Sequence, residues 1–391
     1  MRYDFDTRLD RRPFYSVKWC GYDPEILPLP VADMDFATAP AIQEALAQLV
    51  SHGALGYPCR PPHIAELVAA FLERRHGWSV TPESITFLPG VLAGVRAALA
   101  AFSQPGDAFV TMTPVYPPLF AIGREMGRVA RMVPLACDAA GHHTADLDRL
   151  AEALPGARAL LLCSPHNPVS RVFTREELER IAHLCLQHGV LMISDEIHAD
   201  LVLGTQPHIP LGSLGDEIAQ RSITLMAPSK TYNIAGLSLG FAIAGDAGLT
   251  QALRQAASQT GCGITLPAWV AAVAAYGEQG SVDWLDALRD YLRGNMAYLA
   301  TTLARTLPEV TLSPAEGTFL AWLDCRGLDL GEEPGAFFLR EAKVALNEGT
   351  MFGPGGAGHV RVNVGCPRQL LREALERMAR SLGRSLSDDQ A

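Results

Sequence analysis

Between about residues 84 and 277, short apolar runs alternate with segments whose apolar residues recur at helical spacing. The apolar runs occupy residues 84–90, 107–112, 159–163, 190–194, 222–226 and 239–244. One helical segment, TREELERIAHLCLQHG at residues 174–189, opens with Thr174 and Glu177 at the spacing of a capping box and ends in glycine. Strands separated by helices predict βαβ units. They therefore predict an α/β fold with a mostly parallel sheet covered on both faces.

The pattern changes after about residue 278. Residues 281–307 predict one long amphipathic helix. Strand-like segments at 316–324 and 359–365, a helix near 334–346 and a final helix from residue 367 complete a smaller α+β region. The first thirty-odd residues are irregular, and their own pattern does not show which region they join. We expect a large domain at residues 33–277 and a small domain made of residues 1–32 and 278–391.

Composition and charge narrow the class of protein. The 391 residues are 48% hydrophobic and 19% charged, as in a globular protein. A formal net charge of −10 argues against a general nucleic-acid binder. No apolar run reaches the length of a membrane span, and the first residues lack the apolar core of a signal peptide, so we expect a cytoplasmic protein without a membrane anchor.

Cysteine and histidine spacing gives no sign of a metal site. The eight cysteines include no CxxC pair, and the 11 histidines form no HExxH motif, so we expect neither structural zinc nor metal catalysis. Cys20, Cys163, Cys185 and Cys325 lie in apolar stretches, and we expect them in the core.

In a mostly parallel sheet, functional side chains gather just beyond the carboxyl ends of the strands. The residues that shortly follow apolar runs here are Gly90, Tyr116, Asn167, Asp195 and Lys230. The sequence therefore predicts that a ligand binds along this edge.

Lys230 is unusual because the chain contains only three lysines, Lys18, Lys230 and Lys343, among 32 basic residues. A lysine at a strand end is commonly no more than a partly exposed charge. An amine can also form an imine with a carbonyl cofactor, which a guanidinium cannot do. The segment APSKTYNIAGL (227–237) lacks the glycines of a phosphate-binding P-loop, and no SxxK motif involves Lys230.

An imine-forming lysine needs companions. A pyridinium cofactor needs an anion at its ring nitrogen, and Asp195 follows a strand, although a helix-capping aspartate has the same context. A phosphate needs donors, and the strand–Gly–helix junction at 87–95 offers backbone amides, although such junctions are common. A substrate carboxylate needs a guanidinium, and Arg361 lies in a strand-like segment, although an exposed arginine is the ordinary alternative.

Nine motifs in this order resemble the fold-type I pyridoxal 5′-phosphate (PLP) enzymes of the aminotransferase superfamily, and within it the cystathionine β-lyase-like carbon–sulfur lyases. They are LPVADMDFATAPAIQEAL, HGALGY, PVYPPL, SPHNPVSRVFT, SDEIHADL, APSKTYNIAGL, EGTFLAWLDCR, EAKVALNEGTMFG and VRVNVGCPR. The resemblance covers nearly the whole chain. It implies a seven-stranded, mostly parallel sheet sandwiched by helices, with a smaller α+β domain.

The resemblance also implies roles. Lys230 matches the Schiff-base lysine and general base, and Asp195 matches the partner of the pyridine nitrogen. Tyr116 matches the aromatic residue that stacks on the ring, and Asn167 matches the asparagine at the phenolic oxygen, with His198 nearby. The remaining assignments are Gly90, Val91, Leu92 and Ser229 to the phosphate, Arg361 with Asn167 to the substrate carboxylate, and Tyr57 to the active site of a neighbouring subunit in a homodimer.

Three features depart from the family pattern. Ser170 stands where glycine is usual, and a positive φ there would strain a serine. Ser238 stands where many aminotransferases have a phosphate-binding arginine, eight residues after the lysine. The segment QTGCGITLPAW (259–269) matches poorly, and we expect it to shape the substrate pocket.

The resemblance implies β-elimination of a thiol from L-cystathionine or a related cysteine S-conjugate, giving pyruvate and ammonia. Transamination on the same scaffold is the alternative, because both reactions use the same residues. A PLP-binding regulatory protein with secondary lyase activity is the third reading, and the complete residue set argues against it.

Overall fold

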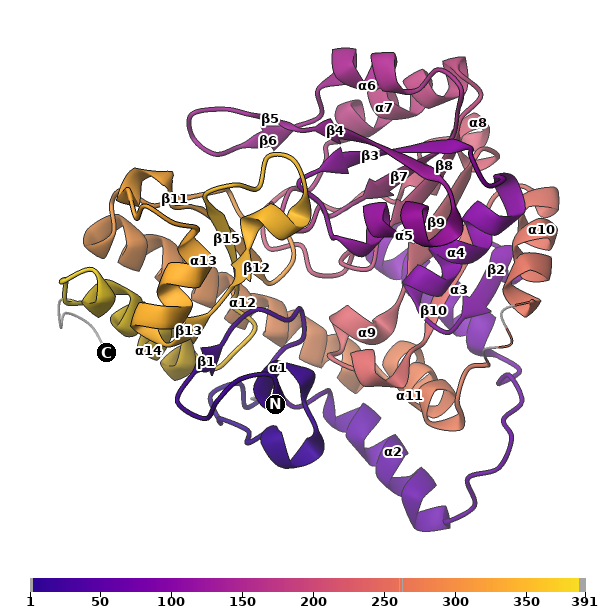
Figure 1. The fold of residues 1–391 in the computed structure, drawn as a ribbon. Coiled ribbons are helices and arrows are strands. Elements are labelled where there is room, and N and C mark those ends of the chain that lie inside the picture. The colour runs from indigo at the N-terminus through magenta and orange to yellow at the C-terminus, as the bar shows by residue number, and fades with distance from the viewer. Residues whose placement is uncertain (1–2, 260, 262, 387–391) are drawn as a thin grey trace.

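The computed structural model describes residues 3–259, 261 and 263–386, and its architecture confirms the predicted α/β class. A seven-stranded sheet forms the centre (Figure 1). Its strands, in spatial order, are β2 (Ile85–Leu88), β10 (Gly240–Ala244), β9 (Ser222–Met226), β8 (Leu191–Asp195), β7 (Ala157–Cys163), β3 (Ala108–Thr113) and β4 (Val129–Pro134). β10 alone runs antiparallel to its neighbours, so the sheet is mostly parallel, as expected.

Helices cover both faces of this sheet. On β7, Leu161 and Cys163 pack in the cluster on one face, whereas Leu160 and Leu162 pack on the other, because side chains alternate along a strand. The first face is covered by α4 (Val91–Phe102), α5 (Pro118–Met126) and α10 (Ala247–Ser258), and the second by α6 (Leu147–Ala153) and α7 (Arg175–Gln187). Burial on both faces explains why the strands read as continuous apolar runs.

The predicted capping box begins α7. The Thr174 hydroxyl accepts the Glu177 amide at 3.1 Å, and the Glu177 carboxylate accepts the Thr174 amide at 2.7 Å. Two backbone donors that the helix itself leaves unpaired are therefore satisfied.

The C-terminal region contains the long helix predicted at 281–307, observed as α12 (Gln279–Thr306). A four-stranded antiparallel sheet lies beyond it, in the order β11 (Thr311–Leu312), β12 (Leu320–Asp324), β15 (His359–Asn363) and β14 (Asn347–Glu348). The last helix, α14 (Arg368–Ser381), begins one residue after the predicted start.

The N-terminal segment joins this C-terminal region. β1 (Leu27–Pro28) pairs in parallel with β13 (Val344–Ala345) (Figure 1). The helix predicted near 334–346 was therefore only partly right. It consists of α13 (Pro334–Phe337) and a π-helical turn at Phe338–Ala342, and it ends where Lys343 adopts a φ of 55° and pairing with β1 begins.

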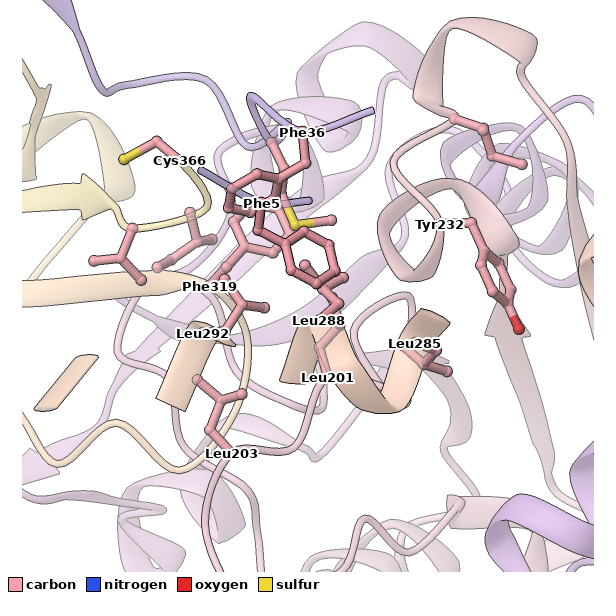
Figure 2. Close-up of a cluster of buried hydrophobic side chains, with 14 of the residues drawn as sticks. Phe5, Phe36, Leu201, Leu203, Tyr232, Leu285, Leu288, Leu292, Phe319 and Cys366 are labelled. Carbon is pink, nitrogen blue, oxygen red and sulfur yellow. The ribbon is translucent and has the colours of Figure 1, made fainter. Parts of the chain in front are cut away.

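The remaining helices are α1 (Val17–Cys20), α2 (Pro40–His52), α3 (Ile64–His76), α8 (Asp216–Ala219), α9 (Pro228–Thr231) and α11 (Leu266–Gly277). The largest core cluster joins the N-terminal segment to α12. Figure 2 shows Leu288 and Leu292 of α12 in this cluster together with Phe5, Phe36 and Leu201. Each fully buried leucine contributes roughly 1.5–3 kcal/mol.

The seven described cysteines are free, and their burial follows the sequence expectation with one exception. Cys163, Cys185 and Cys325 are buried, whereas the expectation for Cys20 was wrong, because Lys18 and Trp19 form the buried side of α1. Cys262 lies outside the described residues. Across the described ranges, each helix is too short or too polar to span a bilayer.

Candidate active site

The carboxyl edge of the central sheet brings most of the expected side chains together. Asp195 ends β8 opposite Cys163 of β7, and its carbonyl accepts the Ser164 amide at 2.9 Å. The Tyr116 amide bonds the Asn167 carbonyl at 3.0 Å, which joins the loops that follow β3 and β7. The strand register and these loop bonds therefore place Tyr116, Asn167 and Asp195 at one edge.

Lys230 lies on the one-turn helix α9, directly after β9, and Pro228 begins the turn. Its Nζ donates to the Ala32 carbonyl at 2.5 Å. Burial lowers the pKa of Lys230 to about 8, although the nearby Asp33 and Asp195 carboxylates oppose this shift. A larger share of Lys230 is therefore a neutral, nucleophilic amine near neutral pH than for an exposed lysine.

Asp195 is fully buried beside this amine. Burial raises the pKa of its carboxyl group to about 6, although the Ile197 amide, 3.1 Å from Oδ1, and the Lys230 charge both act to lower it. A bound cation would stabilise the carboxylate further.

Arg361 is buried rather than exposed, and it points at Asn167. Its Nη1 donates to Asn167 Oδ1 at 2.9 Å, and its Nη2 donates to the Pro30 carbonyl and to Asn347 Oδ1, both at 2.6 Å. Its Nε is buried without a hydrogen-bond partner among the described residues. Burial lowers the pKa of the guanidinium. A carboxylate ligand would therefore meet a fixed cation with an unsatisfied donor.

The expected phosphate site lies where β2 meets α4. Gly90 has a φ of 107°, a conformation that favours glycine, and no side chain caps α4. Gly240 of β10 packs against this junction so closely that a Cβ would lie 3.1 Å from the Val91 nitrogen. The first amides of α4, including those of Val91 and Leu92, have no carbonyl partner within the helix, and a helix N-terminus favours anions.

The other expected residues differ in placement. Ser229 is buried on α9, next to Lys230. His198 is buried near Lys230 and Arg361, where burial and these two cations lower the pKa of its imidazole. Tyr57 is fully exposed in the irregular stretch between α2 and α3, and no described contact joins it to this site.

The three departures from the family pattern are also visible. Ser170 has the positive φ expected for a glycine position, 60°, and its hydroxyl bonds Thr318 Oγ1 at 2.8 Å and the Leu320 carbonyl. Ser238 is exposed with a φ of 52°. Within 259–269, Thr265 caps α11, whereas residues 260 and 262 lie outside the described residues.

Sequence reasoning missed the segment Pro30–Phe36, which threads through the site. Its carbonyls accept hydrogen bonds from Arg361, Lys230 and Asn363, the last donating to Val31 and Asp33, each at 2.7 Å. On its other side, Asn233 bonds the Met34 amide and the carbonyls of Met34 and Phe36. Because every residue carries a backbone carbonyl, residue types cannot reveal which carbonyls accept these bonds. The VADMDF motif was the only sign in the sequence that this segment matters.

These groups fit PLP. The α4 amides and Ser229 can bind a phosphate, Lys230 offers a poorly solvated amine for the aldehyde, and Asp195 offers a buried carboxylate for the ring nitrogen.

The fold and the site define a fold-type I, PLP-dependent enzyme. The chain belongs to the aminotransferase class I and II family, whose family model matches residues 24–378. It is 38% identical to cystathionine β-lyase PatB of Bacillus subtilis (strain 168), over 97% of this chain and 100% of that protein.

Two solved structures share the fold throughout. Cystalysin from Treponema denticola, which contains a PLP cofactor, has a TM-score of 0.93 and 31% identity, and the match covers 98% of this chain and 99% of that chain. A protein named OvoB has a TM-score of 0.91 and 40% identity, covering 99% of this chain and 100% of that chain.

Proposed function

We propose that this protein is a PLP-dependent carbon–sulfur lyase that acts on L-cystathionine or a related cysteine S-conjugate. The observation that carries the proposal is that Lys230 and Arg361 donate to carbonyls of the same short segment, those of Ala32 and Pro30, and that burial lowers the pKa of Lys230. One short segment thereby holds both the proposed base and the proposed carboxylate clamp. Full-length similarity to PatB supports elimination over transamination, as does the absence of an arginine at Ser238.

The proposed roles of the chain's own groups follow from their chemistry. Arg361 and Asn167 hold the substrate carboxylate, which fixes the substrate Cα relative to Lys230. The neutral Lys230 amine takes the Cα proton. Bound PLP supplies the electron sink for the pair left at Cα. Asp195 keeps the ring nitrogen protonated, Tyr116 packs on the ring, and Ser229 and the amides of Gly90, Val91 and Leu92 hold the phosphate, with His198 nearby.

Breaking the Cβ–S bond then releases a thiol. The remaining three-carbon fragment consumes one water and becomes pyruvate and ammonia, so atoms balance without an oxidant or a keto-acid acceptor. Transamination, by contrast, requires a keto acid to regenerate the starting cofactor.

This difference defines the experiment. Purified protein with PLP and L-cystathionine, without any keto acid, should produce pyruvate and free thiol in equal amounts over many turnovers. Turnover that appears only after a keto acid is added would overturn the lyase proposal in favour of an aminotransferase. PLP binding without turnover under either condition would favour the regulatory alternative.

We also propose a homodimer in which Tyr57 reaches the neighbouring active site. The exposure of Val50, Leu55 and Tyr57 along one stretch supports it, because a monomer rarely exposes such a run. Lys230→Ala and Tyr57→Ala proteins refolded together should regain activity that neither has alone, since each hybrid dimer retains one intact site. No gain on mixing, with a dimer present by light scattering, would contradict the shared site.

The domain and compartment assignments are also proposals. Pairing of β1 with β13 supports joining residues 1–32 to 278–391 as the small domain, with 33–277 as the PLP-binding domain. Seven free cysteines among the described residues support a cytoplasmic location, where thiols stay reduced.

A further inference from the structure

The turn that carries Lys230 has little backbone structure of its own. α9 is a single turn of four residues, Pro228–Thr231. The bonds that close it are Tyr232 N–H to the Pro228 carbonyl at 2.9 Å and Ile234 N–H to the Ser229 carbonyl at 3.0 Å. An isolated turn is marginal in water, so the direction of the Lys230 side chain depends on anchors from elsewhere.

One anchor is made by Thr231, the residue that follows Lys230. The Thr231 hydroxyl donates to Asp200 Oδ2 at 2.7 Å, and Asp200 Oδ1 bonds His76 Nε2 at 2.9 Å. Thr231 has no exposed surface and Asp200 is 6% exposed, so water competes poorly for these bonds. The chain His76–Asp200–Thr231 thus connects the end of α3 to the lysine turn.

Asp200 is itself rigidly placed relative to Asp195. It lies five residues after Asp195, in a segment closed by Ala199 N–H to the Glu196 carbonyl and Leu201 N–H to the His198 carbonyl, both at 2.9 Å. Leu201 and Tyr232, the neighbours of Asp200 and Thr231, belong to the same buried cluster, although they lie apart within it (Figure 2). The Asp200–Thr231 bond therefore couples the two segments that carry Lys230 and Asp195.

The carboxylate is also held ionised. Burial alone would raise the pKa of Asp200, but bonds from His76 and Thr231 and the nearby Arg75 charge bring it below the ordinary value. An ionised acceptor makes a stronger hydrogen bond to the hydroxyl than a neutral one does.

We propose that Asp200, acting through the Thr231 hydroxyl, is a positioning residue that directs the Lys230 amine. The proposal rests on the proposed role of Lys230. Without the bond, the turn loses its anchor to the segment that carries Asp195, and the amine samples orientations that face neither PLP nor the substrate Cα. The chemical step then slows. Binding of the substrate carboxylate is unaffected, because Arg361 lies on β15 and not on the lysine turn.

The test compares three variants, two of which replace threonine with valine of nearly the same shape. Thr231→Val removes the hydroxyl and keeps the shape, whereas Thr231→Ser keeps the hydroxyl. Thr111→Val is the control, because Thr111 is equally buried and its hydroxyl bonds the Leu161 carbonyl at 3.0 Å, within the sheet. Melting temperatures will show whether Thr231→Val and Thr111→Val lose comparable stability.

We expect Thr231→Val to lower kcat by roughly 10–100-fold with little change in KM, since small misplacements of reacting groups have effects of this size. Uptake of PLP by the apo-protein, followed by absorbance, should slow by a similar factor. Thr231→Ser and Thr111→Val should each keep kcat and the rate of PLP uptake near the wild-type values. The proposal is overturned if Thr231→Val behaves as Thr111→Val in both measurements, or if Thr231→Ser is as impaired as Thr231→Val.

A double-mutant cycle assigns the effect to Asp200. Asp200→Ala should slow PLP uptake in the wild-type background and have little further effect in Thr231→Val, because both changes remove the Asp200–Thr231 bond and Asp200→Ala adds only the loss of the more distant His76 bond. Additive effects would overturn the claim that Asp200 acts through Thr231. PLP uptake does not require turnover, so these outcomes remain informative even if the wild-type protein fails to cleave cystathionine.

Discussion

Two regions of this protein form the candidate active site, the carboxyl edge of the central sheet and the segment Pro30–Phe36. They differ in whether side chains or backbone groups face the site. The carboxyl edge of the sheet presents side chains, including Asp195 and Lys230, from positions fixed by strand register. The segment Pro30–Phe36 presents mainly backbone carbonyls from irregular chain, and side chains from elsewhere hold it in place. The contribution of the sheet edge therefore depends on residue type, whereas the contribution of the segment depends mainly on the course of its backbone.

Changes to the two regions should therefore have different consequences. Replacing a side chain on the sheet edge removes a reacting group and leaves the scaffold intact. Loosening the segment leaves every reacting group present but removes the acceptors that orient them.

The largest effect is expected at the sheet edge. Lys230→Ala should lower kcat by at least about 10³-fold, because it removes both the amine that binds PLP and the proposed base. The visible absorbance band of the bound cofactor should be lost, while the melting temperature of the apo-protein changes little. A variant that keeps the band and full turnover would show that another residue performs the chemistry.

Asn363→Ala should act through the segment. It removes one of the two donors to each of the Val31 and Asp33 carbonyls and leaves the Gly365 amide without its partner, so the free energy of unfolding should fall by about 3 kcal/mol. Denaturant titration measures this loss, and PLP uptake should weaken as well.

Asn295→Ala is the matched control for that change. Asn295 is also fully buried and makes three comparable hydrogen bonds, to Val364, Cys366 and Arg368, none of them to a residue of the segment. It should lose similar stability and keep normal PLP uptake per folded molecule. Equal effects of both variants on uptake would contradict a specific role for the segment.

A smaller, graded effect should come from pH. Since the pKa of Lys230 is about 8 and only the neutral amine attacks an aldehyde, PLP uptake by the apo-protein should fall about tenfold per pH unit below 8 and level off above it. Stopped-flow absorbance between pH 6 and about 9.5 measures this profile. A midpoint near the ordinary lysine value would contradict the effect of burial on this amine.

The smallest effect concerns Ser170. Ser170→Ala removes the bonds to Thr318 and Leu320 and keeps the strained backbone, whereas Ser170→Gly removes the same bonds and relieves the strain. The glycine variant should therefore be more stable than the alanine variant by about 1 kcal/mol. Equal stabilities by thermal unfolding would show that this serine carries no strain.

Local patterns predicted much of this molecule. The capping box at Thr174, the helix α12 and the residues at the strand ends could all be read from the sequence, because each depends on periodicity or on near neighbours. The placement of Arg361 beside Asn167 came from the resemblance, since strand alternation alone gave no partner.

The rest depended on contacts distant in sequence. The helix near 334–346 is cut short because β13 pairs with β1, more than 300 residues away in the chain. Cys20 is exposed because its neighbours Lys18 and Trp19 bond the buried Asp35. Acceptors such as the Ala32 carbonyl leave no mark on composition or spacing.

The pairing of β1 with β13 has a practical consequence for handling this protein. The amides of Leu27 and Leu29 bond the carbonyls of Lys343 and Ala345, both at 2.9 Å, immediately before the segment that reaches Lys230 begins. Trimming or fusing the chain near Leu27 would therefore disturb the orientation of an amine about 200 residues away in sequence. A purification tag removed by cleavage, or placed after α14, is the safer choice for kinetic work.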